Sequence, residues 1–177
     1  HGINPGLQKK LPYDTLRDFS SISLVASSPL VFVANPAMGA GNIRELVAAA
    51  KAQPGRIAYA SSGPGTGGHL AVELLSWVAG ISLTHVPYKG AAPALIDVIG
   101  GQVQVMCTSP LPAMPHVKSG KLRALAMTGA KRARSTPEIP TLAEAGYAGY
   151  EASLWYALLA PAGTARPIIT RLHAETV

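Results

Sequence analysis

The sequence predicts an α/β fold, a lobe in which a mostly parallel sheet is flanked by helices. Apolar runs of strand length alternate with stretches of helical periodicity along the 177 residues, a pattern typical of strand–helix–strand units. Hydrophobic residues make up 48% of the chain and charged residues only 14%, so the chain can bury a sizeable core. No apolar run approaches the roughly 20 residues that span a bilayer. We therefore expect a folded lobe without a transmembrane segment.

Strands are predicted where short apolar runs end at turn-forming residues such as Gly, Pro, Ser and Asn. These runs cover residues 22–25, 30–34, 57–60, 83–86, 103–107, 122–127 and 155–160. Their spacing leaves room for a helix between most successive strands, as a parallel sheet requires.

Helices are predicted where apolar residues recur with helical spacing. The first begins after Asn42, a suitable N-cap, and ends at Pro54-Gly55; its apolar face is Ile43, Leu46, Val47 and Ala50. The second starts near Gly67 and stops at Gly80, and its predicted apolar face is Leu70, Leu74, Leu75 and Val78. Further helices are expected at residues 92–99, 112–119, 141–145 and 167–177.

The most informative segment is residues 57–75, in which a strand leads through a Gly-rich turn into an amphipathic helix. The first turn of a helix leaves backbone N–H groups unpaired at the positive end of the helix dipole, and glycines let that backbone approach an anion. The turn matches neither a phosphate-binding P-loop nor a dinucleotide fingerprint, which favours a small anion. The candidate ligand-binding residues are Ser61, Ser62, Gly63, Gly65, Thr66, Gly67 and His69. Alternatively the segment merely turns the chain, and His69 fixes the turn instead of contacting a ligand.

Two further strand ends carry residues suited to an anion. Lys89 follows the strand at 83–86, and Thr108 follows the strand at 103–107. Ligands gather at the carboxyl ends of parallel strands, so these turns and the Gly-rich turn can supply converging donors to one carboxylate. The alternative for Lys89 is a solvated surface charge, and for Tyr88 it is core packing.

An α/β hydrolase or transferase with Ser61 or Ser62 as its nucleophile is the alternative from the enzyme class. The segment lacks the G-x-S-x-G spacing of a nucleophile elbow, and no Ser/His/Asp or Cys/His arrangement has the context of a catalytic triad. The histidines lack the i, i+4 spacing of a helical metal site, so we expect neither a metal nor a cofactor. Cys107, the single cysteine, is expected to be a buried thiol.

A nucleic-acid-binding domain is the third reading, because the net charge is +6 and Lys131-Arg132-Ala133-Arg134 is a basic cluster. Aromatic residues make up only 6% of the chain, and no nucleic-acid-binding module with stacking side chains is recognisable. We interpret the cluster as an exposed loop and expect no nucleic acid partner. Salt-sensitive binding to unrelated duplexes would favour this reading instead.

The domain organisation is predicted from two apolar segments, at 21–34 and 153–160, that bracket the rest of the chain. Such a pair can run side by side as the two crossings between lobes. We therefore expect residues 1–28 to contain a remnant of a first lobe and the first hinge strand. Residues 29–152 are expected to form a second, ligand-binding lobe, and 153–177 the return hinge strand and the start of a first-lobe helix.

Several motifs resemble those of the tripartite tricarboxylate transporter substrate-binding family, also called Bug or TctC-like receptors. The main ones are Tyr59-Ala-Ser-Ser-Gly-Pro-Gly-Thr-Gly-Gly-His69-Leu-Ala, His85-Val-Pro-Tyr-Lys-Gly90-Ala-Ala-Pro-Ala-Leu95, Gly100-Gly-Gln-Val-Gln-Val105 and Gly120-Lys-Leu-Arg-Ala-Leu-Ala126. Others are Leu11-Pro-Tyr-Asp-Thr-Leu-Arg-Asp-Phe19, Pro140-Thr-Leu-Ala-Glu-Ala-Gly146 and Leu159-Ala-Pro-Ala-Gly163. They cover nearly the whole chain in the family's order.

The resemblance implies a lobe of the periplasmic-binding-protein-like type II fold. It also implies a non-enzymatic periplasmic receptor of two lobes that closes on a small carboxylate and delivers it to the membrane transporter subunits of the tripartite system. The Gly-rich turn matches the second lobe's carboxylate loop, although Pro64 and Gly68 stand where the family commonly has Asn and a hydroxyl residue. About a hundred residues before His1 and some tens after Val177 are implied as well. We expect this fragment alone to bind weakly and, through uncovered apolar surface, to self-associate.

Overall fold

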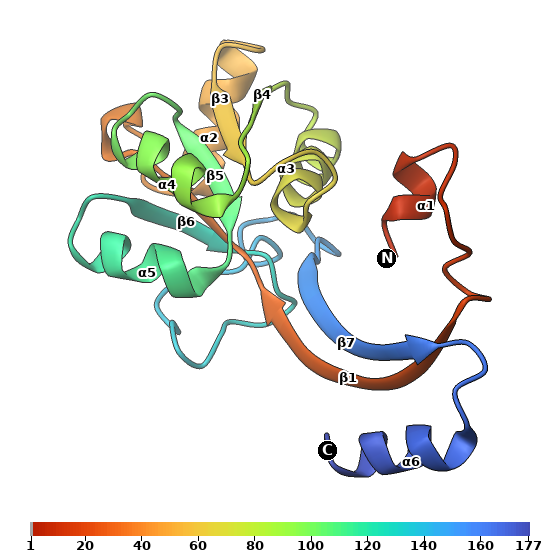
Figure 1. Cartoon of the computed structure of the whole chain (residues 1–177). Coiled ribbons are helices and arrows are strands. Elements are labelled where there is room, and N and C mark those ends of the chain that lie inside the picture. The colour runs from red at the N-terminus through yellow and green to blue at the C-terminus, as the bar shows by residue number, and fades with distance from the viewer. Residues whose placement is uncertain (1) are drawn as a thin grey trace. The chain divides into compact units, whose positions relative to one another are not determined.

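The computed structural model describes residues 2–177, which divide into two compact units. Unit 1 combines the chain up to Ser28 with Leu154–Val177, and unit 2 is Pro29–Ser153. The chain therefore passes from one unit to the other twice, once near each end of unit 2 (Figure 1). None of the helices among residues 2–177 is both long enough and apolar enough to cross a membrane.

Unit 2 is built on a five-stranded sheet in the order β4-β3-β5-β2-β6 (Figure 1). Its strands are β2 (Val31–Ala34), β3 (Ala58–Ser61), β4 (Thr84–Pro87), β5 (Val105–Thr108) and β6 (Arg123–Met127). Each begins within two residues of the predicted start. β3 pairs in parallel with β4 and β5, whereas β2 is antiparallel to β5 and β6. All strands except β2 therefore run in one direction, which confirms the predicted mostly parallel sheet with one reversed strand inside it.

The helices of unit 2 follow the strands closely. They are the 3-10 helix η1 (Pro36–Met38), α2 (Ile43–Ala52), α3 (Gly67–Ala79), α4 (Ala91–Ile99) and α5 (Pro110–Lys118). α2 begins as predicted, because the Asn42 side chain accepts the N–H of Glu45 at 3.0 Å. Its predicted apolar face is buried in full. β2 and β5 are buried along their whole length, so the core lies on both faces of the sheet.

The predicted buried face of α3 is wrong in part. Of the four residues predicted, only Leu75 is buried, and the helix packs mainly through Ala71, Val72 and Ala79. A close approach at its first turn explains the rotation, because a Cβ at Gly68 would overlap the carbonyl oxygen of Cys107 on β5. The buried face is therefore Gly68, Ala71, Val72, Leu75 and Ala79, while Leu70, Leu74 and Val78 are partly or fully exposed.

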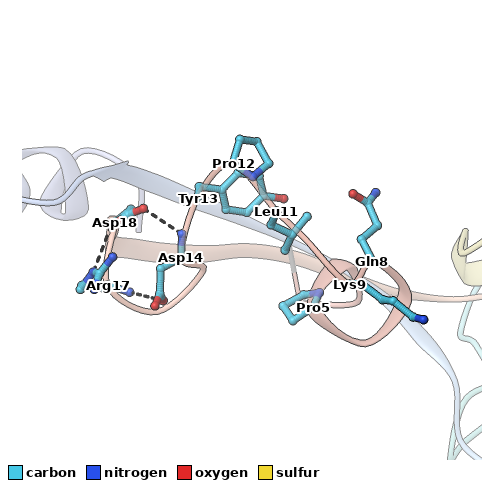
Figure 2. A pocket seen from close by; sticks show the side chains of 9 residues that line it. All are labelled: Pro5, Gln8, Lys9, Leu11, Pro12, Tyr13, Asp14, Arg17 and Asp18. Atoms are coloured by element: carbon cyan, nitrogen blue, oxygen red, sulfur yellow. Dashed lines mark hydrogen bonds and ion pairs between the residues drawn. The ribbon is translucent and has the colours of Figure 1, made fainter.

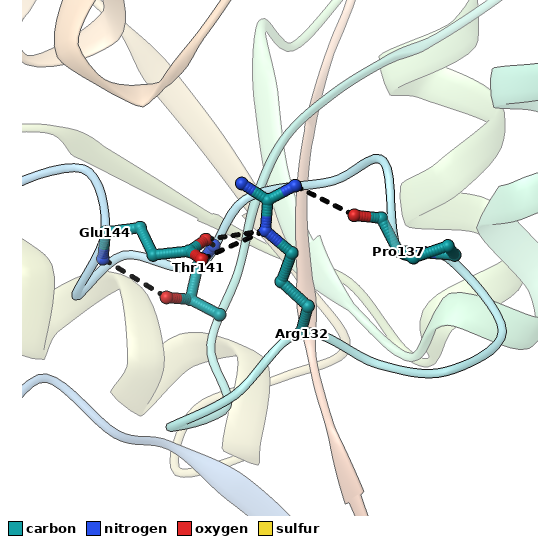
Figure 3. A network of polar contacts seen from close by, with 4 residues as sticks. All are labelled: Arg132, Pro137, Thr141 and Glu144. Carbon is teal, nitrogen blue, oxygen red and sulfur yellow. Dashed lines mark hydrogen bonds and ion pairs between the residues drawn. The ribbon is translucent and has the colours of Figure 1, made fainter.

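The short helix predicted at residues 141–145 does not form. The segment makes turns in which the Glu144 carboxylate accepts the N–H of Thr141 at 2.8 Å, and the Thr141 hydroxyl accepts the N–H of Glu144 at 3.2 Å (Figure 3). Arg132 holds Glu144 with its Nε at 2.9 Å, and Gly146 follows at φ 105°. The Glu144 side chain is thus engaged with Thr141 and Arg132, and the chain turns at once after Ala145, so the segment forms turns instead of a helix.

Unit 1 consists of α1 (Asn4–Leu7), the two-stranded sheet of β1 (Phe19–Pro29) and β7 (Ser153–Pro161), and α6 (Arg166–Ala174). The predicted side-by-side course of the two bracketing segments is confirmed by this sheet. The two strands predicted within the first segment both form: β1 ends at Pro29 and pairs with β7, whereas Val31–Ala34 forms β2 of the larger sheet. A proline lacks the N–H that a continuing strand would donate, which fits the end of β1.

One buried hydroxyl ties together the two ends of unit 2. The Thr128 Oγ1 accepts the N–H of Leu30 at 2.7 Å and donates to the carbonyl of Ala152 at 2.5 Å. The backbone N–H of Thr128 donates to Leu30 at 2.9 Å, and the N–H of Ala152 donates to Thr128 at 3.0 Å. Thr128 is fully buried. The chain therefore enters and leaves unit 2 beside a single residue after β6.

Replacing this hydroxyl by a methyl group tests the tie. Thr128→Val keeps the side-chain volume but leaves the N–H of Leu30 and the carbonyl of Ala152 without that partner. We expect the free energy of unfolding to fall by about 1–3 kcal/mol. Thr164→Val is the control, since its hydroxyl donates to Pro161 at an exposed position. Urea unfolding of both variants measures the difference, and equal stabilities would contradict the assigned role.

Unit 1 exposes an unusual amount of apolar surface. Leu24 and Val25 on β1 are 64% and 55% exposed, and Trp155 and Tyr156 on β7 are 57% and 54% exposed. Neighbouring residues on a strand point to opposite faces, so neither face is covered at these positions. α6 buries no residue, and its Ile168 is 53% exposed.

This surface predicts that the chain self-associates. Exposed apolar patches of this kind gain free energy by leaving water, so light scattering should give a mass that rises with protein concentration. Val25→Lys combined with Trp155→Lys places charges on the patch and should lower the apparent mass. Lys118→Gln combined with Lys121→Gln, which changes surface charge at two exposed positions outside the patch, is the control and should leave the apparent mass unchanged. A monomer at every concentration would contradict the prediction.

Candidate functional site

The predicted site residues lie at the carboxyl ends of three neighbouring strands. In the parallel register Ser61 of β3 faces Pro87 of β4, and Ala60 faces Met106 of β5. Ser61, Pro87 and Thr108 therefore end their strands at one edge of the sheet. The helices α3, α4 and α5 begin immediately after this edge, so their N-termini gather there (Figure 1).

The three helices at this edge begin without a side-chain cap. Thr66 before α3, Gly90 before α4 and Ser109 before α5 make no capping hydrogen bond from a side chain. By contrast, α2 is capped by Asn42. Within residues 2–177, the N–H groups of Gly67, Gly68 and His69 have no acceptor. The edge therefore presents unpaired donors at the positive end of a helix dipole, which attract an anion.

The turn at residues 61–66 is held by hydrogen bonds within itself. The Ser61 Oγ accepts the N–H of Gly63 at 3.1 Å and lies 3.2 Å from the carbonyl oxygen of Gly63. The Thr66 hydroxyl donates to the same carbonyl at 2.8 Å. Gly63 and Gly65 have φ values of 130° and 75°, which favour glycine. The turn is thus a defined structure whose shape depends on its own polar groups.

His69 points back into this turn. Its Nδ1 accepts the N–H of Gly65 at 3.1 Å. Of the two alternatives for His69, fixing the turn is the contact that the structure contains. Ser61 is fully buried, and its Oγ lies 2.7 Å from the Nε2 of His85. A nucleophile must reach its substrate, so the buried Ser61 does not suit the hydrolase alternative.

Three residues beside the turn were missed by the sequence analysis: Tyr59, Glu73 and His85. The ring of Tyr59 stacks on that of His85 with centroids 4.8 Å apart, and His69 stacks on His85 at 4.3 Å. The Tyr59 hydroxyl donates to the Glu73 carboxylate at 2.5 Å. Tyr59 and His85 face each other in the β3–β4 register, a pairing that strand alternation could have suggested.

The environment of this cluster changes the pKa values of its members. Burial lowers the pKa of His85, the neighbouring His69 lowers it further, and Glu73 acts in the opposite direction. Burial and the Glu73 carboxylate raise the pKa of Tyr59. The cluster therefore favours a neutral imidazole at His85 and a neutral phenol at Tyr59.

The remaining predicted residues differ in their surroundings. Ser62 is half-buried and Lys89 is exposed, and neither makes a side-chain hydrogen bond or ion pair within residues 2–177. Thr108 is 6% exposed at the end of β5. The Tyr88 hydroxyl donates to the Asp97 carboxylate at 2.6 Å, which raises the pKa of Tyr88 to about 12. Tyr88 is thereby tied to α4.

Unit 1 contains a separate pocket of about 450 Å³ that the sequence analysis did not predict (Figure 2). Lys9, Tyr13, Asp14, Arg17 and Asp18 are among the residues that line it. Its two carboxylates are already engaged, since Asp18 accepts the N–H of Asp14 at 2.8 Å and pairs with Arg17 at 3.5 Å. Asp14 in turn accepts the N–H groups of Leu16 and Arg17, which lowers its pKa. These anionic groups make the pocket a poor carboxylate site.

The basic cluster at residues 131–134 is partly neutralised. Arg132 binds both oxygens of Glu144 through its Nε, at 3.0 and 2.9 Å, and donates to the carbonyl of Pro137 at 2.8 Å (Figure 3). The N–H of Thr141, and after it Arg132, holds the pKa of Glu144 below its usual range. Cys107 is buried, as predicted, and burial raises its pKa. No group of three potential metal ligands occurs within residues 2–177.

These features are those of a solute-receptor lobe, with a doubly covered sheet whose strand ends carry a Gly-rich turn and unpaired N–H groups. The family model for the tripartite tricarboxylate transporter family receptor matches residues 2–177, and the chain belongs to this family. It is a family of receptors and not of enzymes. The predicted type II periplasmic-binding-protein-like fold is confirmed by the similar structures described next.

Individual relatives support the assignment. The chain is 38% identical over 171 residues to the protein BugT of Bordetella pertussis, covering 97% of this chain and 52% of BugT. It resembles the structure of R. palustris Rpa4515 with adipate at a TM-score of 0.88 and 33% identity, covering 95% of this chain and 56% of that one. For MatC of Rhodopseudomonas palustris with bound malate, the TM-score is 0.87 and the identity 29%, covering 98% and 59%. The chain spans about half the length of the curated relatives it matches.

The contact between α3 and β5 generates a test of how the site is built. Gly68→Ala would place a Cβ against the Cys107 carbonyl, so α3 must move away from the sheet. We expect the free energy of unfolding to fall by about 1–3 kcal/mol. Gly6→Ala is the control, because no atom lies within 4 Å of a Cβ at Gly6. Thermal unfolding followed by circular dichroism makes the comparison, and an unchanged midpoint for Gly68→Ala would contradict the packing.

Proposed function

We propose that this chain contributes the second lobe of a periplasmic receptor, binds one carboxylate group of a small solute at the edge formed by β3, β4 and β5, and serves a tripartite tricarboxylate-type membrane transporter. The observation that supports this most is the gathering of three uncapped helix N-termini at that edge. An anion there gains hydrogen bonds that the free protein lacks, together with a favourable dipole. In this proposal residues 29–152 form the ligand-binding lobe, and residues 1–28 and 153–177 supply the hinge strands and part of the first lobe.

The proposal divides the predicted residues into two groups by their contacts. Ser61, Gly63, Gly65 and Thr66 are engaged with one another or with histidines, so they shape the turn. Ser62, Gly67 and Lys89 keep donors without partners within residues 2–177, so they contact the carboxylate. Thr108 adds a hydroxyl at the same edge. His69 does not need to contact the ligand, because it fixes the turn by accepting the N–H of Gly65.

The solute class is inferred from the chemistry of the donors and from the neighbours. Backbone N–H groups and one lysine recognise a carboxylate without selecting what is attached to it. The two similar structures named above hold adipate and malate, which both carry two carboxylates. The proposed edge suits one carboxylate of such a ligand. A second carboxylate then needs donors elsewhere in the receptor.

A lysine substitution tests whether the edge formed by β3, β4 and β5 binds a carboxylate. Lys89→Gln removes the cation and should weaken dicarboxylate binding by roughly 3- to 10-fold, the size expected for a charge that water screens. Lys118→Gln is the matched control, because Lys118 is also exposed but ends α5, away from the strand ends. Calorimetry with adipate and malate on the full-length receptor gives the affinities. Equal weakening in both variants would indicate a general charge effect and contradict the site.

A further inference from the structure

We infer that His85 and His69 are positioning residues that hold the carboxylate turn through specific ring nitrogens, so that carboxylate affinity depends on both imidazoles remaining neutral. This inference rests on the proposed function, because it concerns the same turn. Neither histidine needs to contact the ligand. Each acts by fixing the backbone from which the ligand's donors project.

The two histidines hold different points of the turn through different atoms. The Nε2 of His85 lies 2.7 Å from the Ser61 Oγ, and that oxygen accepts the N–H of Gly63 at 3.1 Å. The Nδ1 of His69 accepts the N–H of Gly65 at 3.1 Å. Gly63 and Gly65 are the two residues of the turn with positive φ values. Each histidine therefore acts, directly or through Ser61, on a position where the backbone has most freedom.

The rings are themselves fixed by stacking and by one hydrogen bond. His69 and His85 lie with centroids 4.3 Å apart and planes at 28°, and Tyr59 stacks on His85 at 4.8 Å and 16°. Tyr59 is fully buried, and its hydroxyl donates to Glu73 on α3. β3, β4 and α3 thus each supply a ring to one stack. A side chain placed in this way transmits its position to the turn.

A proton on this pair works against the arrangement. The Nδ1 of His69 can accept the Gly65 N–H only while it carries no proton. At His85, burial and the nearby His69 lower the pKa, and two protonated rings at this separation would repel each other. The titratable side chains that face the pair are Tyr59 from β3 and Glu73 from α3, and Glu73 opposes the shift. Because the folded arrangement disfavours a proton on His85, the stability that this residue contributes is lost as the pH falls below the ordinary histidine range.

The test uses substitutions that keep or remove one nitrogen. An Asn carboxamide reaches about where Nδ1 lies, and a Gln carboxamide about where Nε2 lies. His69→Asn and His85→Gln should therefore stay within about 3-fold of wild-type affinity for adipate or malate, whereas His69→Phe and His85→Phe, which keep a ring, should lose roughly 5- to 10-fold. His116→Phe, on α5 away from the turn, is the control and should bind as wild type.

The pH dependence of carboxylate affinity separates a role of the ring nitrogens from a role of the rings in packing alone. The affinities of the wild type and of the double variant His69→Asn/His85→Gln are measured at about pH 7.5 and about pH 5. We expect the fold-loss of affinity of the wild type to be about 3 times that of the double variant, or more. Ligand protonation is the same for both proteins and cancels in the comparison. The N–H resonance of Gly65 should titrate in the wild type and not in the double variant.

The outcomes separate this inference from the proposed function. If the wild-type full-length receptor binds neither carboxylate, the proposed function fails. If the wild type binds but the Phe variants bind equally well, or if the double variant keeps the full pH dependence, the positioning role is wrong. Unfolding curves at each pH identify a variant that has lost its fold, and for such a variant the Asn and Gln substitutions and the Gly65 resonance decide the question.

Discussion

The site depends on one constraint, the common direction of β3, β4 and β5. Parallel strands joined by helices bring every strand end, and every following helix N-terminus, to the same edge of the sheet. Unpaired N–H groups from separate turns therefore meet without any long-range contact between side chains. β2 is antiparallel to β5, and β2 and β6 extend the sheet beyond β5. Next to β6, Thr128 joins the two ends of unit 2 through its hydrogen bonds. The direction of a few short strands thus decides where the unpaired N–H groups gather.

Most of this arrangement could be predicted from the sequence because it is encoded locally. The strand runs end at turn residues, Asn42 has the chemistry of an N-cap, and the glycines between Ser61 and His69 permit a tight turn. Each of these signals acts over a few residues and survives tertiary packing. The two bracketing apolar segments were also informative, since β1 and β7 pair as expected.

The features that the sequence did not reveal are those that depend on distant contacts. The rotation of α3 follows from the fit of Gly68 against Cys107, which no helical periodicity records. The turn at Thr141 replaces a helix because Arg132, nine residues earlier, captures Glu144. The stack of Tyr59, His69 and His85 joins three elements, and only a correct β3–β4 register brings its members together. At each of these positions a contact with a residue distant in sequence determines the local structure, and the local sequence pattern does not record that contact.

A binding turn has to meet two opposed requirements. Its donors must remain unpaired so that the ligand can take them, yet unpaired backbone groups leave a turn without the hydrogen bonds that would define its shape. In this chain the two requirements fall on different groups. The polar atoms of Ser61, Gly63 and Gly65 are engaged within the protein, and the N–H groups of Gly67 and its neighbours on α3 are left open. Because the stacked, half-buried rings of His69 and His85 supply the inner contacts, the turn can be rigid before any ligand arrives, and little ordering entropy remains to oppose binding.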